Sequence, residues 1–115
     1  MPSSRNIAAL GALTLSAAIT MPVFAADAER GKEVAMDRSK GNCIACHYLP
    51  DGESPGKIGP ALVAIQGRFD TKEKLREQIY DATVSNPESS MPPFGKHKIL
   101  TDEEFENVVE YVWSL

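Results

Sequence analysis

The two cysteines of this chain stand three positions apart, in the segment Cys43-Ile44-Ala45-Cys46-His47. Two cysteines at this spacing with a histidine directly after them are typical of covalent haem attachment. On one helical turn, both thiols lie on the same face and can bond the two vinyl groups of one porphyrin edge. His47 follows directly, so its imidazole can ligate the iron. The motif therefore predicts one covalently attached haem c, bound through Cys43 and Cys46, with His47 as an axial ligand.

Three other uses of these cysteines fit the sequence less well. A structural zinc site would need Cys43, Cys46, His47 and His97 together, but the chain has no pair of histidines at the usual spacing. A thioredoxin-like redox pair would open a helix after a strand, and no strand pattern precedes the motif. A disulfide between the two cysteines would close a very small loop and stabilise the chain little. Haem attachment is therefore the preferred interpretation.

Residues 1–25 have the pattern of a cleavable secretory signal peptide. Residues 7–20 carry no charge and are mostly Ala, Leu and Ile, and residues 23–25 place small side chains where a signal peptidase cuts. A retained membrane anchor is less favoured, because the apolar run is shorter than the roughly 20 residues that a span needs and Pro22 interrupts its end. We expect cleavage after Ala25 or the next residue. This would leave residues 26–115 as one periplasmic domain without a membrane span.

The composition excludes one class of partner. The chain carries 12 Lys and Arg against 16 Asp and Glu, a net charge of −4 at pH 7, and cleavage removes a further positive charge, Arg5. Nucleic acid is therefore not expected as a main partner, because phosphate binding needs basic clusters that are absent here. A domain this small buries a modest core and needs support such as a bound prosthetic group.

Two helices at the ends of the domain are expected to pack together. Residues 26–37 have helical hydrophobic spacing, and Gly31 on their apolar face would let another element approach closely. The last helix begins at Thr101, which forms a capping box with Glu104. Its apolar stripe consists of Phe105, Val108, Val109 and Val112.

Between them, the sequence predicts one more helix and long loops. This helix opens with Asp70 as its cap and continues to about Val84, and Asn86-Pro87 stops it. Residues 48–69 are rich in Gly and Pro and are expected to form mostly loop. Because no segment alternates long enough to form a sheet, we expect an all-α fold of three to four helices.

A late loop offers a second iron ligand. In Ser90-Met91-Pro92-Pro93, the prolines bias Met91 toward extended geometry and fix the backbone behind it, which suits a thioether aimed at iron. His97 is the competing ligand, and a histidine would lower the reduction potential relative to methionine. His97 stands between two lysines in a segment that is expected to be an exposed turn. Met91 is therefore the preferred second ligand of the iron.

Two further expectations concern loops near the haem. A backbone carbonyl at Gly59-Pro60 could accept the second ring N–H of His47 and orient the imidazole, although an ordinary turn fits the spacing equally well. An apolar patch for a stable partner could come from Phe94, Ile99 and Leu100. The basic residues Lys96 and Lys98 in the same stretch suit a diffusible carrier instead.

Together these features resemble class I cytochromes c, and more narrowly the SoxX family, the haem subunits of periplasmic SoxAX complexes. The narrower resemblance covers residues 41–115. It rests on Gly41-Asn42-Cys43, residues 58–62, Arg68-Phe69, Asp81-Ala82-Thr83, Asn86-Pro87 and, above all, residues 91–101.

The resemblance implies a class I cytochrome c fold whose long loops wrap the haem, with His47 and Met91 ligating the iron. In that family, SoxA pairs with SoxX, and the complex joins thiosulfate oxidatively to a cysteine of the carrier SoxYZ, an L-cysteine S-thiosulfotransferase reaction. The reactive site belongs to SoxA, so no residue of a SoxX-like chain is catalytic. Its haem accepts electrons and passes them to a soluble cytochrome c. A stand-alone class I cytochrome c carrier, or a five-coordinate haem sensor if Met91 is displaced, remains the alternative.

Overall fold

The computed structural model describes residue 11, residues 16–20 and residues 24–115, so the expected signal peptide lies largely outside the described residues. Within these residues the chain forms helices and turns without a strand. The elements are α1 (Ala28–Met36), η1 (Cys43–Ala45), η2 (Ile65–Gly67), α2 (Lys72–Tyr80), η3 (Ala82–Val84) and α3 (Asp102–Trp113), where η marks a 3₁₀ turn. Among the described residues, no helix combines the length and the apolar composition of a membrane span.

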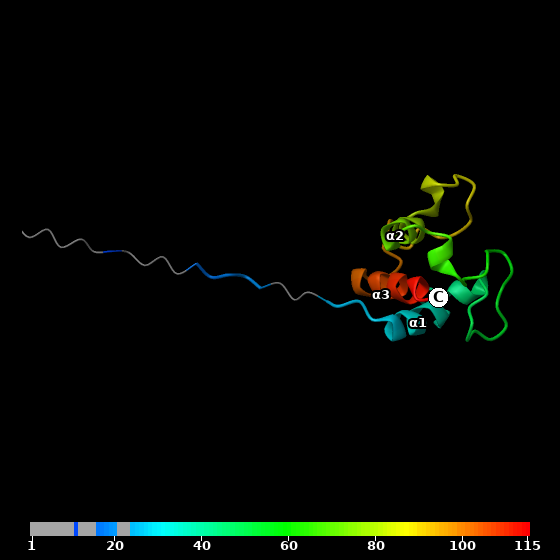
Figure 1. Ribbon diagram of the computed structural model, residues 1–115, viewed down its shortest axis with the longest axis horizontal. Coiled ribbons are helices and arrows are strands. Elements are labelled where there is room, and N and C mark those ends of the chain that lie inside the picture. Colours follow the sequence, from blue (N-terminus) through cyan, green and yellow to red (C-terminus); the bar gives the residue numbers. More distant parts are fainter. Residues whose placement is uncertain (1–10, 12–15, 21–23) are drawn as a thin grey trace, which may run out of the picture.

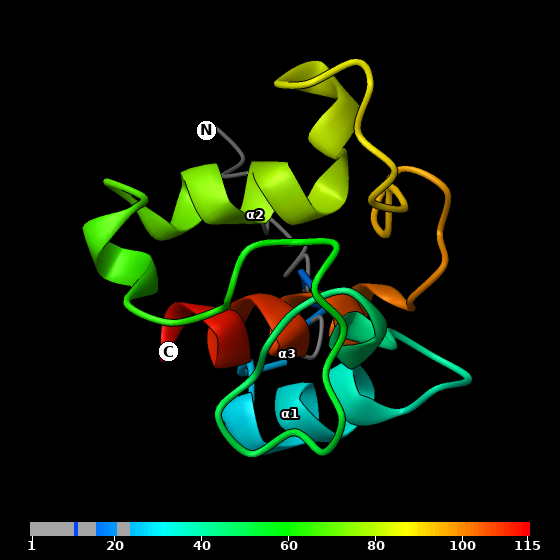
Figure 2. The same cartoon turned by 90° about the vertical axis from the view of Figure 1, so that its right-hand side faces the viewer.

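The helix α3 lies between the other two, with α1 on one side and α2 on the other (Figures 1 and 2). This arrangement confirms the expected packing of the first helix on the last. Gly31 makes the close approach possible, because a Cβ at this position would lie 1.9 Å from the backbone oxygen of Asn107 and 2.8 Å from Cβ of Tyr111. The buried Asn107 side chain also accepts a hydrogen bond of 2.8 Å from the backbone N–H of Asp27, which caps α1.

The start of α3 has the expected capping box. The Thr101 hydroxyl accepts from the backbone N–H of Glu104, and the Glu104 carboxylate accepts from the backbone N–H of Thr101. Two otherwise unpaired N–H groups are thereby satisfied. The same carboxylate pairs with Lys40, which lies just before the cysteine motif.

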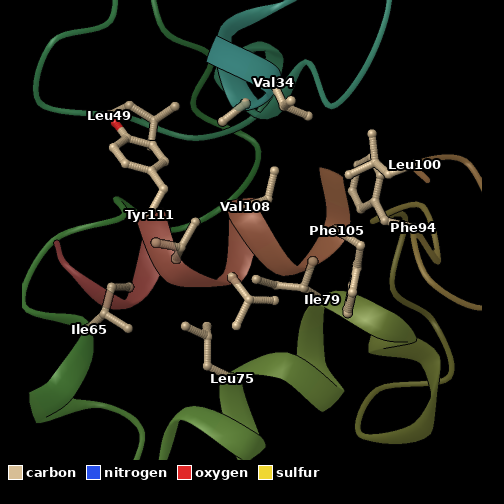
Figure 3. Packing of buried hydrophobic residues seen from close by; sticks show 13 residues of the cluster. Val34, Leu49, Ile65, Leu75, Ile79, Phe94, Leu100, Phe105, Val108 and Tyr111 are labelled. Atoms are coloured by element: carbon tan, nitrogen blue, oxygen red, sulfur yellow. The ribbon is translucent and has the colours of Figure 1, made fainter. Parts of the chain in front are cut away.

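The core is built around α3 (Figure 3). The four residues of the predicted apolar stripe are all buried. Val34 of α1 packs on one side of them, and Leu75 and Ile79 of α2 pack on the other. Burial of each such side chain contributes about 1.5–3 kcal/mol. The loops complete this core with Leu49, Ile65, Phe94 and Leu100.

The cap of α2 differs from the prediction. Thr71, not Asp70, caps the helix, and its hydroxyl accepts a hydrogen bond from the backbone N–H of Lys74. The Asp70 carboxylate lies 2.6 Å from Nζ of Lys74 instead. Sequence spacing alone did not distinguish these adjacent residues, because either side chain can serve as a cap.

The end of α2 also differs from the prediction. The helix ends at Tyr80, four residues before the expected end, because Asp81 adopts an extended backbone with φ −156° and ψ 94°. The chain then turns again as η3. The Asp81 carboxylate accepts hydrogen bonds from the backbone N–H and hydroxyl of Thr83. An aspartate that bonds its own local backbone in this way competes with helix continuation.

Replacement of Gly31 by alanine should loosen the crossing of α1 and α3. The added Cβ would overlap the Asn107 backbone, so we expect the free energy of unfolding to fall by about 1–3 kcal/mol in urea titrations of the holoprotein. Gly67→Ala is the matched control, because nothing lies within 4 Å of a Cβ at that position. Equal stability of the two variants would contradict this packing.

The ion pair between Glu104 and Lys40 should give the protein a pH-dependent stability. Hydrogen bonds from Lys40 and from the Thr101 backbone lower the pKa of Glu104. Its contribution is therefore present above the unfolded-state pKa and is lost as the pH falls through the lower folded-state pKa. We expect Glu104→Gln to lower the free energy of unfolding by up to about 1 kcal/mol at pH 7.

That difference from the unmodified protein should disappear in acid, below the folded-state pKa of Glu104. Urea titrations at several pH values measure it. Glu53→Gln, at an exposed loop position, controls for the change in net charge. A Glu104→Gln difference that stays constant from neutral to acidic pH would contradict the account.

Candidate haem site

A cavity of about 800 Å³ lies beside α3, a volume within the usual range for ligand pockets. Its floor consists of core side chains, including Ile65, Leu75, Ile79, Val108 and Val112. Side chains from distant segments meet around it. All five residues expected at the haem line this one cavity, namely Cys43, Cys46, His47, Pro60 and Met91.

The His47 ring is held in one tautomer. Its Nδ1 lies 2.6 Å from the carbonyl oxygen of Pro60. A carbonyl oxygen can only accept a hydrogen bond, so Nδ1 must carry a proton, and in the neutral ring Nε2 then has the lone pair. The carbonyl considered at Gly59-Pro60 therefore does bond the histidine. The second ring nitrogen is left able to bind a metal ion.

Two glycines bring the following loop against the cysteine motif. A Cβ at Gly59 would lie 2.3 Å from Cε1 of His47, and a Cβ at Gly56 would lie 1.8 Å from the Ala45 carbonyl oxygen. The Gly59 N–H also donates to the carbonyl of Cys46 at 2.7 Å. Sequence reasoning considered Gly59 only for a carbonyl near His47, and it missed both Gly56 and the close approach that the two glycines allow. Their spacing within a Gly- and Pro-rich loop directly after the motif was the available signal.

The cysteine motif forms a single 3₁₀ turn. The backbone N–H groups of Cys46 and His47 both donate to the Cys43 carbonyl, at 3.2 and 2.9 Å. Both cysteines are free thiols. Burial raises the pKa of the Cys43 thiol to about 11, so it is protonated at neutral pH. The turn thus presents two unpaired thiols and a histidine to the same cavity.

On the other side of the cavity, Met91 is half-buried and lines the wall. Its backbone N–H donates to the Ser89 hydroxyl at 3.3 Å. His97, the competing candidate, is exposed and is not part of the lining. The geometry therefore favours Met91 over His97 as a side chain that faces a bound group.

The expected apolar patch for a partner is partly wrong. Phe94 and Leu100 are buried in the core and cannot form a surface. Ile99 is 44% exposed and lines the rim of the cavity, as expected. Ile58, which is 77% exposed on the same rim, was missed. The spacing of apolar residues in an irregular loop does not show which of them turn inward.

Comparison with known proteins places the chain in a family. The family model described as "Cytochrome C oxidase, cbb3-type, subunit III" matches residues 26–112. The chain belongs to this cytochrome c family. Cytochromes c carry covalently bound haem c, and the residues present here fit that group: the cavity is large and mainly apolar, the thiols are free, and His47 uses Nδ1 for the bond to Pro60, so Nε2 is the nitrogen left for a metal ion.

Individual relatives agree with this assignment. A cytochrome c6 from a Synechococcus species is 31% identical over 97% of this chain and 91% of its own length. A second cytochrome c6, from Rippkaea orientalis, is 30% identical over 82% of this chain. An uncharacterized lipoprotein of Aquifex aeolicus is 38% identical over 64% of this chain, and the match spans about a third of the lipoprotein, 36% of its length.

A solved structure, SoxXA from P. pantotrophus, superposes on this cytochrome with a TM-score of 0.67. The identity is 27%, and the match covers 76% of this chain and 80% of the other. The predicted fold class is confirmed: this is an all-α, class I cytochrome c fold. The resemblance to SoxX-type monohaem cytochromes is likewise supported by this match.

Replacement of Gly59 by alanine should disturb haem binding without touching the core. The added Cβ would overlap the His47 ring and break the bond from Nδ1 to Pro60. We expect a severalfold lower yield of haem-loaded protein, and a high-spin fraction in what is recovered, measured by the ratio of haem to protein absorbance and by the visible spectrum. Gly67→Ala should match the unmodified protein. A fully loaded Gly59→Ala variant with an unchanged spectrum would contradict the close approach.

Proposed function

We propose that residues 26–115 form the electron-transfer subunit of a periplasmic SoxAX-type L-cysteine S-thiosulfotransferase, after removal of residues 1–25. One haem c would be bonded to Cys43 and Cys46, with the iron between His47 and Met91. The observation that carries the proposal is the cavity lined by both of these side chains, in a chain whose fold is similar to SoxXA.

The haem supplies one-electron chemistry, and the chain's residues decide how that chemistry is used. The Pro60 carbonyl accepts a hydrogen bond from Nδ1–H of His47, which orients the imidazole and fixes Nε2 as the nitrogen available to the iron. Met91 would supply a thioether ligand from the opposite wall of the cavity, which would exclude small external molecules and favour a higher reduction potential. Apolar side chains on the cavity floor would keep water away from a bound haem. These properties suit electron transfer and not oxygen or peroxide chemistry.

No residue of this chain is expected to act on thiosulfate. The chain has two cysteines, and both are assigned to the haem. The sulfur chemistry would take place on a SoxA-like cytochrome in a heterodimer, with a SoxYZ-like protein as carrier. This chain would accept the electrons released and pass them to a soluble cytochrome c.

The rim of the cavity suits a stable partner. Ile58 and Ile99 are exposed there, and apolar side chains around a buried redox centre are typical of an interface core. The similarity to cytochromes c6 supports the alternative, a stand-alone class I cytochrome c carrier. The two functions differ in whether a second cytochrome remains bound.

Purification of the tagged chain from the periplasm of thiosulfate-grown cells tests the proposal. We expect a second cytochrome to co-purify in stoichiometric amount. Thiosulfate with a SoxYZ-like carrier should then reduce the haem of this chain. Ile58→Asp should release the partner, whereas Val84→Asp, 82% exposed and outside the cavity, should not. A lone monomer that thiosulfate and the carrier leave oxidised would favour the stand-alone carrier.

Removal of the Met91 thioether tests the second axial ligand. We expect Met91→Ala to lower the reduction potential, to admit external imidazole and to abolish the weak sulfur-to-iron absorbance at the red end of the oxidised spectrum. Potentiometry and absorbance titration measure these effects. Met36→Leu, which changes the methionine at the end of α1, should leave all three unchanged. An unaltered potential and spectrum in Met91→Ala would mean that another group ligates the iron.

A further inference from the structure

Asp81 has an unusual position, because its buried carboxylate holds two segments that are distant from each other along the loop. The side chain is only 7% exposed. One oxygen, Oδ1, accepts from the backbone N–H and hydroxyl of Thr83. The other, Oδ2, accepts from Nζ of Lys96 at 3.0 Å. Met91 lies in the chain between these two partners.

The segment before Met91 is linked to η3 by short-range hydrogen bonds. The Asn86 N–H donates to the Ala82 carbonyl at 3.0 Å, and the Ser89 N–H donates to the Asn86 carbonyl at 2.9 Å. The Met91 N–H then donates to the Ser89 hydroxyl. Successive turns therefore connect the Thr83 side of the carboxylate to the methionine.

The segment after Met91 returns to the end of α2. The Lys96 N–H donates to the Tyr80 carbonyl at 3.2 Å. Gly95 lies against the Tyr80 ring, since a Cβ there would be 2.0 Å from Cδ2. The Tyr80 ring in turn packs edge-on against Phe105 of α3, with centroids 5.8 Å apart. Figure 2 shows this loop leaving the end of α2 and coming back toward α3.

We propose that Asp81 is a positioning residue that closes the loop carrying Met91 and so keeps the thioether in the cavity. The inference rests on the proposed ligation of iron by Met91. Its basis is the geometry of one buried carboxylate that bonds both arms of the loop, namely the segment before Met91 through Thr83 and the segment after Met91 through Lys96. The resulting closed loop spans residues 81–96.

The carboxylate is well suited to this role at neutral pH. Hydrogen bonds from Thr83 and Lys96 lower the pKa of Asp81, so both arms meet an ionised group. Hydrogen bonds to a charged group are stronger than those between neutral groups. Loss of either arm would raise the fraction of molecules in which the loop is open and Met91 has left the cavity.

Binding of imidazole to the oxidised holoprotein measures that open fraction. Imidazole must displace Met91, so its apparent affinity rises in proportion to the fraction of open loops. We expect Asp81→Asn to bind imidazole about tenfold to a hundredfold more tightly, from the usual strength of hydrogen bonds to charged groups. Lys96→Gln should bind it about fivefold more tightly, because the Lys96 side chain is 56% exposed. Absorbance titration gives the dissociation constants.

Lys98→Gln is the matched control. It makes the same change of charge two residues away and breaks an exposed ion pair of 2.7 Å with Asp102, which bonds neither arm of the loop. We expect its imidazole affinity to stay within about twofold of the unmodified protein, because exposed pairs contribute little. Since Lys96 is itself largely exposed, Lys96→Gln serves as the test if Asp81→Asn does not fold.

A double-mutant cycle separates positioning from general stability. In a Met91→Ala background nothing remains to be displaced, so Lys96→Gln should no longer change imidazole affinity. Unchanged affinity in the single variants, an equal change in Lys98→Gln, or an effect that persists without Met91 would each overturn the proposal. Failure of Met91 ligation itself would be distinguished earlier, because the unmodified protein would then lack the sulfur-to-iron absorbance.

Discussion

The hydrogen bond from Nδ1 of His47 to the Pro60 carbonyl is the interaction on which the site depends. It fixes the tautomer of the imidazole and leaves Nε2 free to bind a metal ion. The bond forms because Gly56 and Gly59 let the loop backbone lie directly against the cysteine motif. The thiols, the histidine and the loop thereby form one wall of a single cavity, and Met91 lies on another.

The same cavity explains how so small a domain is stabilised. Core residues such as Leu75 and Val108 form its floor, so the cavity adjoins the helix packing directly. A covalently bound haem would fill this space and extend the modest core of so small a domain. The helix α3 contributes to both the helix packing and the cavity floor. The contact of α1 with α3 at Gly31 therefore also holds the helix that forms this floor.

The sequence predicted those features that depend on local spacing. The cysteine motif, the capping box at Thr101 and the close contact at Gly31 each follow from residues a few positions apart, or from a residue type that permits one geometry. Features set by tertiary contacts were missed. Asp81 ends α2 because its carboxylate bonds Thr83 and Lys96, and the inward packing of Phe94 depends on a loop that no periodicity describes. The roles proposed for Met91 and Pro60 remain predictions about the haem-bound protein.

Near-infrared magnetic circular dichroism of the oxidised holoprotein tests the central claim most directly, because the band position distinguishes a histidine–methionine pair from a bis-histidine pair. We expect the histidine–methionine band at neutral pH, since Met91 lines the cavity and His97 does not. A bis-histidine band, or a high-spin spectrum without a sixth ligand, would contradict it.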